Sequence, residues 1–180
     1  MKNFLKTLPL AALVLLITAS VGLAQSATGT SSVTVTVGAE ASLTVSSPTA
    51  LTAVGTVFNN YTGTTTVTYL VRTTKVGGSG SISLEVTTDF SPAGGPSVAT
   101  PPTAGDALKY TCTAAAPATG CTGTQTASTT VTSPVATFGT DAHATSSPAS
   151  TATTSWTLTN DPVYKTGSYA ATVTYTISAS

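Results

Sequence analysis

The sequence contains little charge and few of the side chains that usually carry catalysis or bind ligands. Charged residues make up 7% of its 180 residues and aromatic residues 6%, and there are two cysteines and one histidine. Proteins that bind nucleic acid need clusters of Lys and Arg against the phosphates, whereas the six basic residues here are scattered along the chain. We therefore predict no nucleic-acid partner.

Patterns typical of catalysis and metal binding are also missing. A hydrolase triad needs a histidine beside a nucleophile and a carboxylate, and the one histidine, His143, lies in a stretch rich in Ser, Ala and Thr. The acidic residues stand singly, without the pairing that glycosidases or calcium sites require. Asn160-Asp161 fits the start of a turn better than a calcium site. We predict that the protein is not an enzyme and that it uses no cofactor or metal.

The first 24 residues have the three-part pattern of a secretory signal peptide. Lys2 and Lys6 precede an apolar run over residues 8–21, and small residues lead up to an expected cleavage after Ala24. The apolar run is shorter than the ~20 residues that a membrane-spanning helix needs. We therefore predict an exported protein, secreted or held at the cell surface, with periplasmic transit as one route and no transmembrane span in the mature chain.

The mature chain, residues 25–180, is about the length of one domain. Threonine makes up about a quarter of it, and valine is also abundant. These β-branched residues favour strands, and residues that favour helix interiors are scarce. Four basic and six acidic residues leave the mature chain with a net charge of −2, which gives no polybasic patch for anionic lipid.

Apolar and hydroxyl side chains alternate with a period of two along most of the mature chain, as expected for strands with one buried face. The clearest pair, at 66–72 and 82–87, is separated by a glycine-rich turn at 76–80, which predicts a hairpin. Further strands are predicted at 33–37, 43–45, 108–112, 131–138, 155–159 and 169–177. This spacing predicts an all-β fold, an antiparallel immunoglobulin-like β-sandwich, with a jelly roll or barrel as the alternative.

Two cysteines, Cys112 and Cys121, lie nine residues apart around a loop of small residues. In an exported chain such a pair is expected to form a disulfide. Two free thiols are the alternative. A metal site is disfavoured because no second Cys pair or histidine lies nearby.

Parts of the sequence resemble bacterial surface proteins. Trp156-Thr157-Leu158 resembles the Trp-x-Leu motif of WxL domains, which bind the peptidoglycan wall, and Tyr175-Thr176-Ile177 resembles a second copy of that motif. A Thr/Val strand after the leader, the strand Ala-Ser-Leu-Thr-Val at 41–45 and the ending Thr-Val-Thr-Tyr-Thr-Ile at 172–177 are similar to spore-coat-U and chaperone–usher pilin-like proteins. Both resemblances imply an immunoglobulin-like sandwich on the outside of a bacterium.

The first and last predicted strands of the mature chain carry no charge, although charged residues normally protect sheet edges from pairing with other chains. The segment containing Val33, Val35 and Val37 is therefore a candidate assembly strand, which would pair with another subunit. The alternative is that it pairs within its own sandwich. Tyr61 and Trp156 are candidate surface-binding residues for cell-wall glycan, and for Trp156 the alternative is a place in the core.

Together these features predict a secreted or cell-surface structural or adhesive protein, such as a pilin-like or coat-like subunit. Its partners would be copies of itself or other surface subunits, joined by strand addition. The alternative function is a surface module that binds cell-wall or other glycan.

Overall fold

A computed structural model of the chain describes residues 28–46, 48–55 and 57–180. The predicted signal peptide, residues 1–24, lies outside the described residues. The chain divides into two compact units, residues 1–35 and 36–180. Of the first unit only residues 28–35 are described, and they contain no helix or strand.

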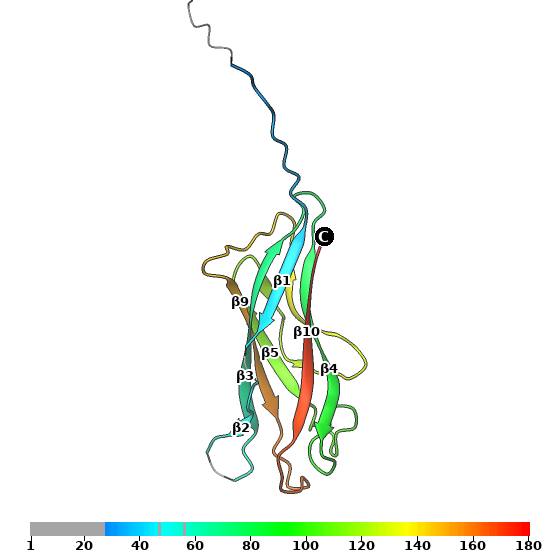
Figure 1. Ribbon diagram of the computed structural model, residues 1–180. Helices are drawn as coiled ribbons and strands as arrows, with labels where there is room; N and C mark the ends of the chain where they lie inside the picture. Colours follow the sequence, from blue (N-terminus) through cyan, green and yellow to red (C-terminus); the bar gives the residue numbers. More distant parts are fainter. Residues whose placement is uncertain (1–27, 47, 56) are drawn as a thin grey trace, which may run out of the picture. The chain divides into compact units, whose positions relative to one another are not determined.

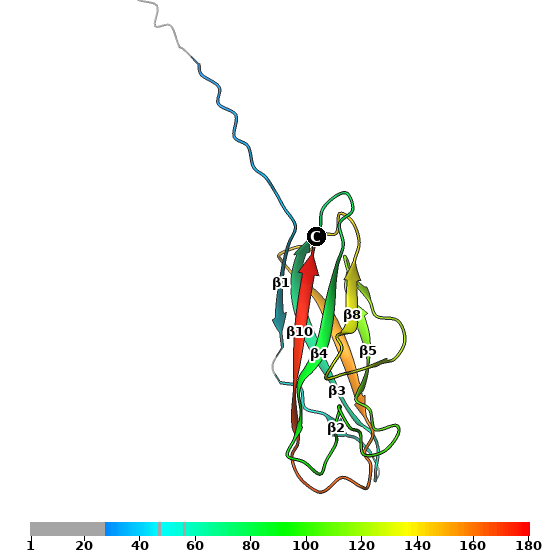
Figure 2. The same cartoon turned by 90° about the vertical axis from the view of Figure 1, so that its right-hand side faces the viewer.

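The second unit contains two antiparallel sheets, which confirms the all-β sandwich prediction (Figures 1 and 2). The first sheet has the order β1-β3-β9-β5-β7, with β2 also paired to β3, and the second has the order β10-β4-β8-β6. The strands of the first sheet are β1 (Glu40–Val45), β2 (Thr52–Ala53), β3 (Tyr61–Arg72), β5 (Lys109–Ala114), β7 (Gln125–Thr126) and β9 (Ser150–Leu158). Those of the second are β4 (Gly80–Ser91), β6 (Thr119–Gly120), β8 (Ser133–Phe138) and β10 (Ala170–Ala179).

The strand order follows that of a constant-type immunoglobulin domain, in which one sheet holds strands A, B, E and D and the other holds C, F and G. The row β1-β3-β9-β5 corresponds to A-B-E-D, and β4 and β10 correspond to C and F. The short strands β8 and β6 extend the second sheet beyond β4. No strand of the described residues occupies the place of G, beside β10.

Alternation along the central strands builds the core. Val67, Tyr69 and Val71 of β3 are at most 4% exposed, and on β4 the alternating residues Ile82 and Leu84 are at most 1% exposed. Each such side chain contributes roughly 1.5–3 kcal/mol when it is removed from water. The intervening threonines face outward, where their β-branched side chains favour the extended backbone.

The predicted hairpin between 66–72 and 82–87 is wrong, although both strands exist. β3 lies in the first sheet and β4 in the second, so the two strands face each other across the core instead of pairing. The residues that connect them form hydrogen bonds with other parts of the chain. Thr73 donates its backbone N–H to the Ala142 carbonyl, and Thr74 donates its backbone N–H to the Ser180 carbonyl. Both strands are apolar on one face, and a connection of seven residues, 73–79, is long enough to cross between sheets.

Hydrogen bonds also form inside the core, because two threonines occupy inward positions. The Trp156 indole nitrogen donates to the Thr65 hydroxyl at 2.9 Å, and the hydroxyls of Thr154 and Tyr175 lie 2.7 Å apart. Thr65 and Thr154 are 7% and 1% exposed. A buried hydroxyl without a partner would cost about 1–3 kcal/mol. The aromatic partners, together with the Thr49 hydroxyl beside Thr65 and the Thr65 carbonyl beside Thr154, avoid that cost.

The predicted disulfide between Cys112 and Cys121 is confirmed, with the two Cα atoms 5.3 Å apart. Cys112 lies on β5 in the first sheet, and Cys121 directly follows β6 in the second. The disulfide therefore joins the two sheets at the side of the sandwich away from β1 and β10.

The β4–β5 connection is a long loop, as its prolines and glycines predict, and Asp89 organises its first part. The Asp89 carboxylate accepts hydrogen bonds from the backbone N–H groups of Phe90, Val98 and Ala99 and from the Ser97 hydroxyl. Burial acts to raise the pKa of Asp89, but these hydrogen bonds together outweigh it and leave the pKa lowered. The ionised carboxylate is therefore the form that the folded loop prefers.

Replacing Trp156 with Phe should lower the free energy of unfolding by roughly 2–3 kcal/mol, because the smaller ring leaves a cavity and the Thr65 hydroxyl loses one of its two side-chain partners. Urea denaturation followed by circular dichroism would measure the change. The control is Ser155→Ala, which alters an exposed neighbour on β9 and should stay within about 0.5 kcal/mol. Equal stability of the two variants would contradict the core placement of Trp156.

Asp89→Asn should destabilise the fold at pH 7 by about 1 kcal/mol, allowing for the partial exposure of the carboxylate. The folded pKa of Asp89 is lowered, so its contribution is complete above the unfolded pKa of about 3.9 and is lost as pH falls through the folded value. Unfolding curves of both proteins between neutral pH and about pH 3 should therefore converge at the acidic end. A difference that is constant with pH would show that the charge of Asp89 is irrelevant.

Candidate functional site at the free sheet edges

The strands β1 and β10 are edge strands that lie side by side. β1 pairs only with β3, and β10 pairs only with β4. The two edges contact each other without forming a ladder, as both views show (Figures 1 and 2). Each edge strand therefore has one side whose backbone N–H and C=O groups have no strand partner within the described residues.

The inward side chains of these edge strands are less buried than those of the central strands. Val173, Tyr175 and Ile177 on β10 pack against the core but remain partly exposed, and Val45 on β1 is 41% exposed. Leu84, which is the β4 partner of Tyr175, is 1% exposed. The apolar core is thus less well covered along the β1–β10 side.

β10 also lacks the usual protection of a sheet edge. Its ten residues, Ala170–Ala179, include no charged residue and no proline, which are the common means of preventing edge-to-edge pairing. Its register with β4 is irregular only near its start, between Ala170 and Val173. Most of the edge is therefore a regular template to which another strand could add.

The candidate assembly strand forms no strand in the single chain. Residues 33–37 lie in the region 28–39, which has no regular secondary structure, and Val33, Val35 and Val37 are 88%, 74% and 63% exposed. The prediction of a strand here is wrong for the chain by itself. A lone extended segment has no neighbour for its backbone hydrogen bonds, so alternation alone does not make it a strand.

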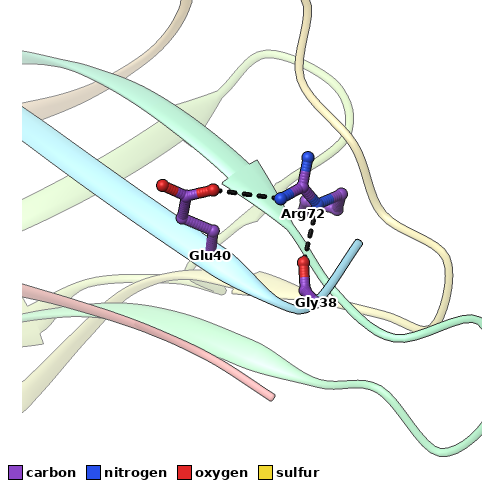
Figure 3. A network of polar contacts seen from close by, with 3 residues as sticks. All are labelled: Gly38, Glu40 and Arg72. Carbon is purple, nitrogen blue, oxygen red and sulfur yellow. Dashed lines mark hydrogen bonds and ion pairs between the residues drawn. The ribbon is translucent and has the colours of Figure 1, made fainter. Parts of the chain in front are cut away.

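Arg72 fixes the point at which this segment joins β1 (Figure 3). Its Nε donates to the Gly38 carbonyl at 2.7 Å, and Nη2 lies 3.0 Å from the Glu40 carboxylate. The side chains of Arg72 and Glu40 are 45% and 78% exposed, so the pair contributes little to stability. Its effect is to set where the chain enters the first strand.

Two shallow hollows flank Arg72, with volumes of about 280 and 330 Å³. His143 borders both of them, and its Nδ1 lies 2.8 Å from the carbonyl oxygen of Asp141. His143 is an exposed loop residue, and its backbone forms an isolated antiparallel β-bridge with the backbone of Arg72.

The two candidate surface-binding residues occupy different environments. Trp156 is 5% exposed and packs against Tyr110, with ring centroids 5.2 Å apart. It is therefore a core residue, and neither face of its ring is open to a sugar. Tyr61 is partly buried at the start of β3, where it pairs with Leu158.

Sequence reasoning missed the Arg72–Gly38 contact and the position of β10 next to β1. The lack of charge on the last predicted strand suggested a sheet edge, but alternation identifies a strand and not its neighbours. Phe58 was also missed: it is 59% exposed and has a φ of 54°. Its conformation is rare for a bulky residue.

Within the described part of the chain, no three His, Cys, Asp or Glu side chains gather as a metal-binding group. The same residues contain no helix long and apolar enough to cross a membrane. Comparison with protein-family models, with curated proteins and with solved structures found no match.

Arg72→Ala should change the free energy of unfolding by less than about 1 kcal/mol but should increase amide hydrogen exchange at the start of β1. The reason is that the Gly38 carbonyl and the Glu40 carboxylate both lose their donor. Hydrogen–deuterium exchange with mass spectrometry would measure it. Glu40→Gln is the control, since it leaves the Arg72–Gly38 bond in place and should change exchange less. Unchanged exchange in Arg72→Ala would contradict the anchoring role.

Proposed function

We propose that this protein is a structural or adhesive subunit of a bacterial cell surface that joins to its neighbours by strand addition. The segment 32–38 of one copy pairs with the free edge of β10 in the next copy. The added strand occupies the place that strand G has in an immunoglobulin sandwich.

The free edge of β10 is the observation that carries this proposal. It is uncharged over its whole length, and its inward residues Val173, Tyr175 and Ile177 are only partly buried. An added strand would supply both the missing hydrogen-bond partners and apolar side chains to cover this region. Its contribution would come from the burial of valine side chains, each worth roughly 1.5 kcal/mol or more, and from the new backbone ladder.

The segment 32–38 fits such an edge in its pattern. Val33, Val35 and Val37 alternate with Thr34 and Thr36, just as Val173 and Ile177 alternate with threonines on β10. Paired in register, the valines would extend the apolar inner face and the threonines the hydroxyl-covered outer face. The segment has no charge and no proline, so nothing in it opposes entry into a sheet.

The donor and acceptor surfaces differ, so the contact is heterologous. Contacts of this kind produce rings when the rotation closes and open filaments when it does not. A subunit that donates one strand and accepts another is therefore suited to a polymeric surface structure. The resemblance to pilin-like and coat-like proteins supports the same role.

The alternative function, a module that binds cell-wall or other glycan, has less support. Sugar binding commonly uses an exposed aromatic face, and Trp156 offers none. Tyr61 is partly buried between neighbouring strands. No observation on these residues favours a glycan over strand addition.

The mature chain, residues 25–180, should form concentration-dependent oligomers or filaments in size-exclusion chromatography and negative-stain electron microscopy. Deleting residues 25–37 should leave a folded monomer, because the deletion removes the donor strand but keeps Gly38, the acceptor of the Arg72 bond. A synthetic peptide with the sequence of residues 28–38 should bind the truncated protein and raise its Tm.

Two variants, each with several substitutions in the segment 32–38, distinguish strand pairing from a general effect of mutating this segment. Changing Val33, Val35 and Val37 to Ser should abolish assembly, whereas changing Thr34 and Thr36 to Ser should preserve it. A monomeric mature chain at every concentration, together with a truncated protein that ignores the peptide, would refute strand addition.

A further inference from the structure

The sandwich of residues 36–180 has two ends, which its long strands connect (Figure 1). At the first, here called the entry end, the chain enters β1 next to Arg72, and residues 73–79 connect β3 to β4. At the second, the loop end, β3 begins beside the last residue of β9, and β10 begins beside the last residue of β4. The β2–β3 and β9–β10 connections therefore both lie at the loop end.

The loop end carries exposed apolar side chains that the core does not use. Val54, Val57 and Phe58 belong to the β2–β3 connection, and all three are exposed, Val57 by 85%. Val163, in the neighbouring β9–β10 connection, is also exposed. Exposed apolar side chains that gather at one place on a surface mark contacts with other molecules, whereas single ones need no explanation. We call Val54, Val57 and Phe58 the apolar tip.

The backbone of the β2–β3 connection holds the apolar tip in its exposed arrangement. The side-chain amide of Asn59 donates to the Val54 carbonyl at 3.0 Å. Gly55 has a φ of 112°, and a Cβ atom there would lie 2.5 Å from the Asn59 amide nitrogen. The φ of 54° at Phe58 is rare for a bulky residue. Rare conformations persist only where the surrounding structure imposes them, and they cluster at binding and active sites.

The direction of an added strand determines which part of a second copy reaches the loop end, and this step rests on the proposed strand addition. All strand pairs of the described residues are antiparallel. A strand in the place of G therefore runs opposite to β10. Since β10 begins at the loop end, the added segment of the second copy leaves the sheet there.

The alternation indicates how close the second copy comes. Directly opposite residues of an antiparallel pair lie on the same face, so each donor valine lies opposite an inward residue of β10. With Val35 opposite Tyr175, the middle residues of the two sets, Gly38 lies opposite Thr172, near the start of β10. Only Ala39 then separates Gly38 from β1 of its own copy, a distance of at most about 7 Å. The entry end of the donating copy therefore lies against the loop end of the accepting copy.

The entry end can receive an uncharged, apolar partner. Val76, in the β3–β4 connection, is 88% exposed. The charges around it balance, since Arg72 and Lys75 are matched by Glu40 and Asp141 on the walls of the two hollows. The apolar tip brings no charge of its own, because positions 41–71 contain no charged residue.

We propose that the apolar tip of an accepting copy packs around Val76 of the donating copy and forms a second contact between successive subunits. The added strand joins the two copies, and the end contact fixes the angle between them. Burial of Phe58 and the valines drives it. Because the two surfaces differ, the contact is heterologous and repeats from one subunit to the next along a filament.

A peptide separates the two contacts, because it supplies the donor strand without an entry end. The tip variant, Val57→Ser with Phe58→Asn, should raise the concentration needed for assembly of the mature chain roughly 10–100-fold, as measured by sedimentation velocity. Asn tolerates the positive φ at position 58. In the chain that lacks residues 25–37, the same variant should bind the peptide of residues 28–38 as tightly as the unaltered sequence does.

Val131→Ser is the matched control. Val131 is an exposed valine in the β7–β8 connection, where Ser128 accepts a hydrogen bond from Val86 in the middle of β4. It lies away from both ends, so its replacement should leave assembly unchanged. Equal assembly of the tip variant and this control would refute the end contact, and so would weaker peptide binding by the tip variant. If the peptide fails to bind even the unaltered truncated chain, strand addition fails and the end contact fails with it.

Crosslinking tests which ends meet. Copies with Val57→Cys, mixed with copies with Val76→Cys, should be joined by a short bismaleimide, whereas neither variant should crosslink to itself. The native cysteines are bonded to each other and do not react. Deleting residues 25–37 from both variants should abolish the crosslink. Crosslinks within Val76→Cys alone would place two entry ends together, as parallel strand addition does, and would overturn the proposal, as would crosslinks within Val57→Cys alone.

Discussion

The sandwich depends on the burial of every second side chain between two sheets that carry very little charge. The inward residues at the centres of β3 and β4 are almost fully removed from water, and threonine on β3 and serine on β4 occupy most of the outward positions. The outer face of such a sheet needs residues that favour the extended backbone and that interact with water. Threonine does both, because its β-branching favours strands and its hydroxyl is hydrated. Polar groups that do enter the core, at Thr65 and Thr154, are held there by the partners Trp156 and Tyr175.

The same constraint explains why the two sides of the sandwich differ. Where the sheets end at β5 and β6, a disulfide joins them. Where they end at β1 and β10, the inward residues stay partly exposed, and the edge strand β10 carries no charged residue and no proline. The strand-addition proposal and the absence of a G-like strand among the described residues both concern this second side.

Much of the fold could be predicted from the sequence, and the reasons for the failures are physical. Period-two alternation identified the strands that became β1, β3, β4, β5, β8, β9 and β10, since it reports which face is buried. It does not report neighbours, so β3 and β4 were wrongly paired as a hairpin. Residues 33–37 alternate as well as any strand does, but a strand exists only beside a partner.

The disulfide between β5 and the residue after β6 also determines how the two sheets can separate. Because Cys112 and Cys121 belong to opposite sheets, the covalent bond acts as a hinge along one side. Any opening of the core must then begin on the other side, where β1 and β10 are held by weaker contacts. A strand added beside β10 would lie across that opening. Each subunit of an assembly would then have one side held by its disulfide and the other side covered by the strand of its neighbour.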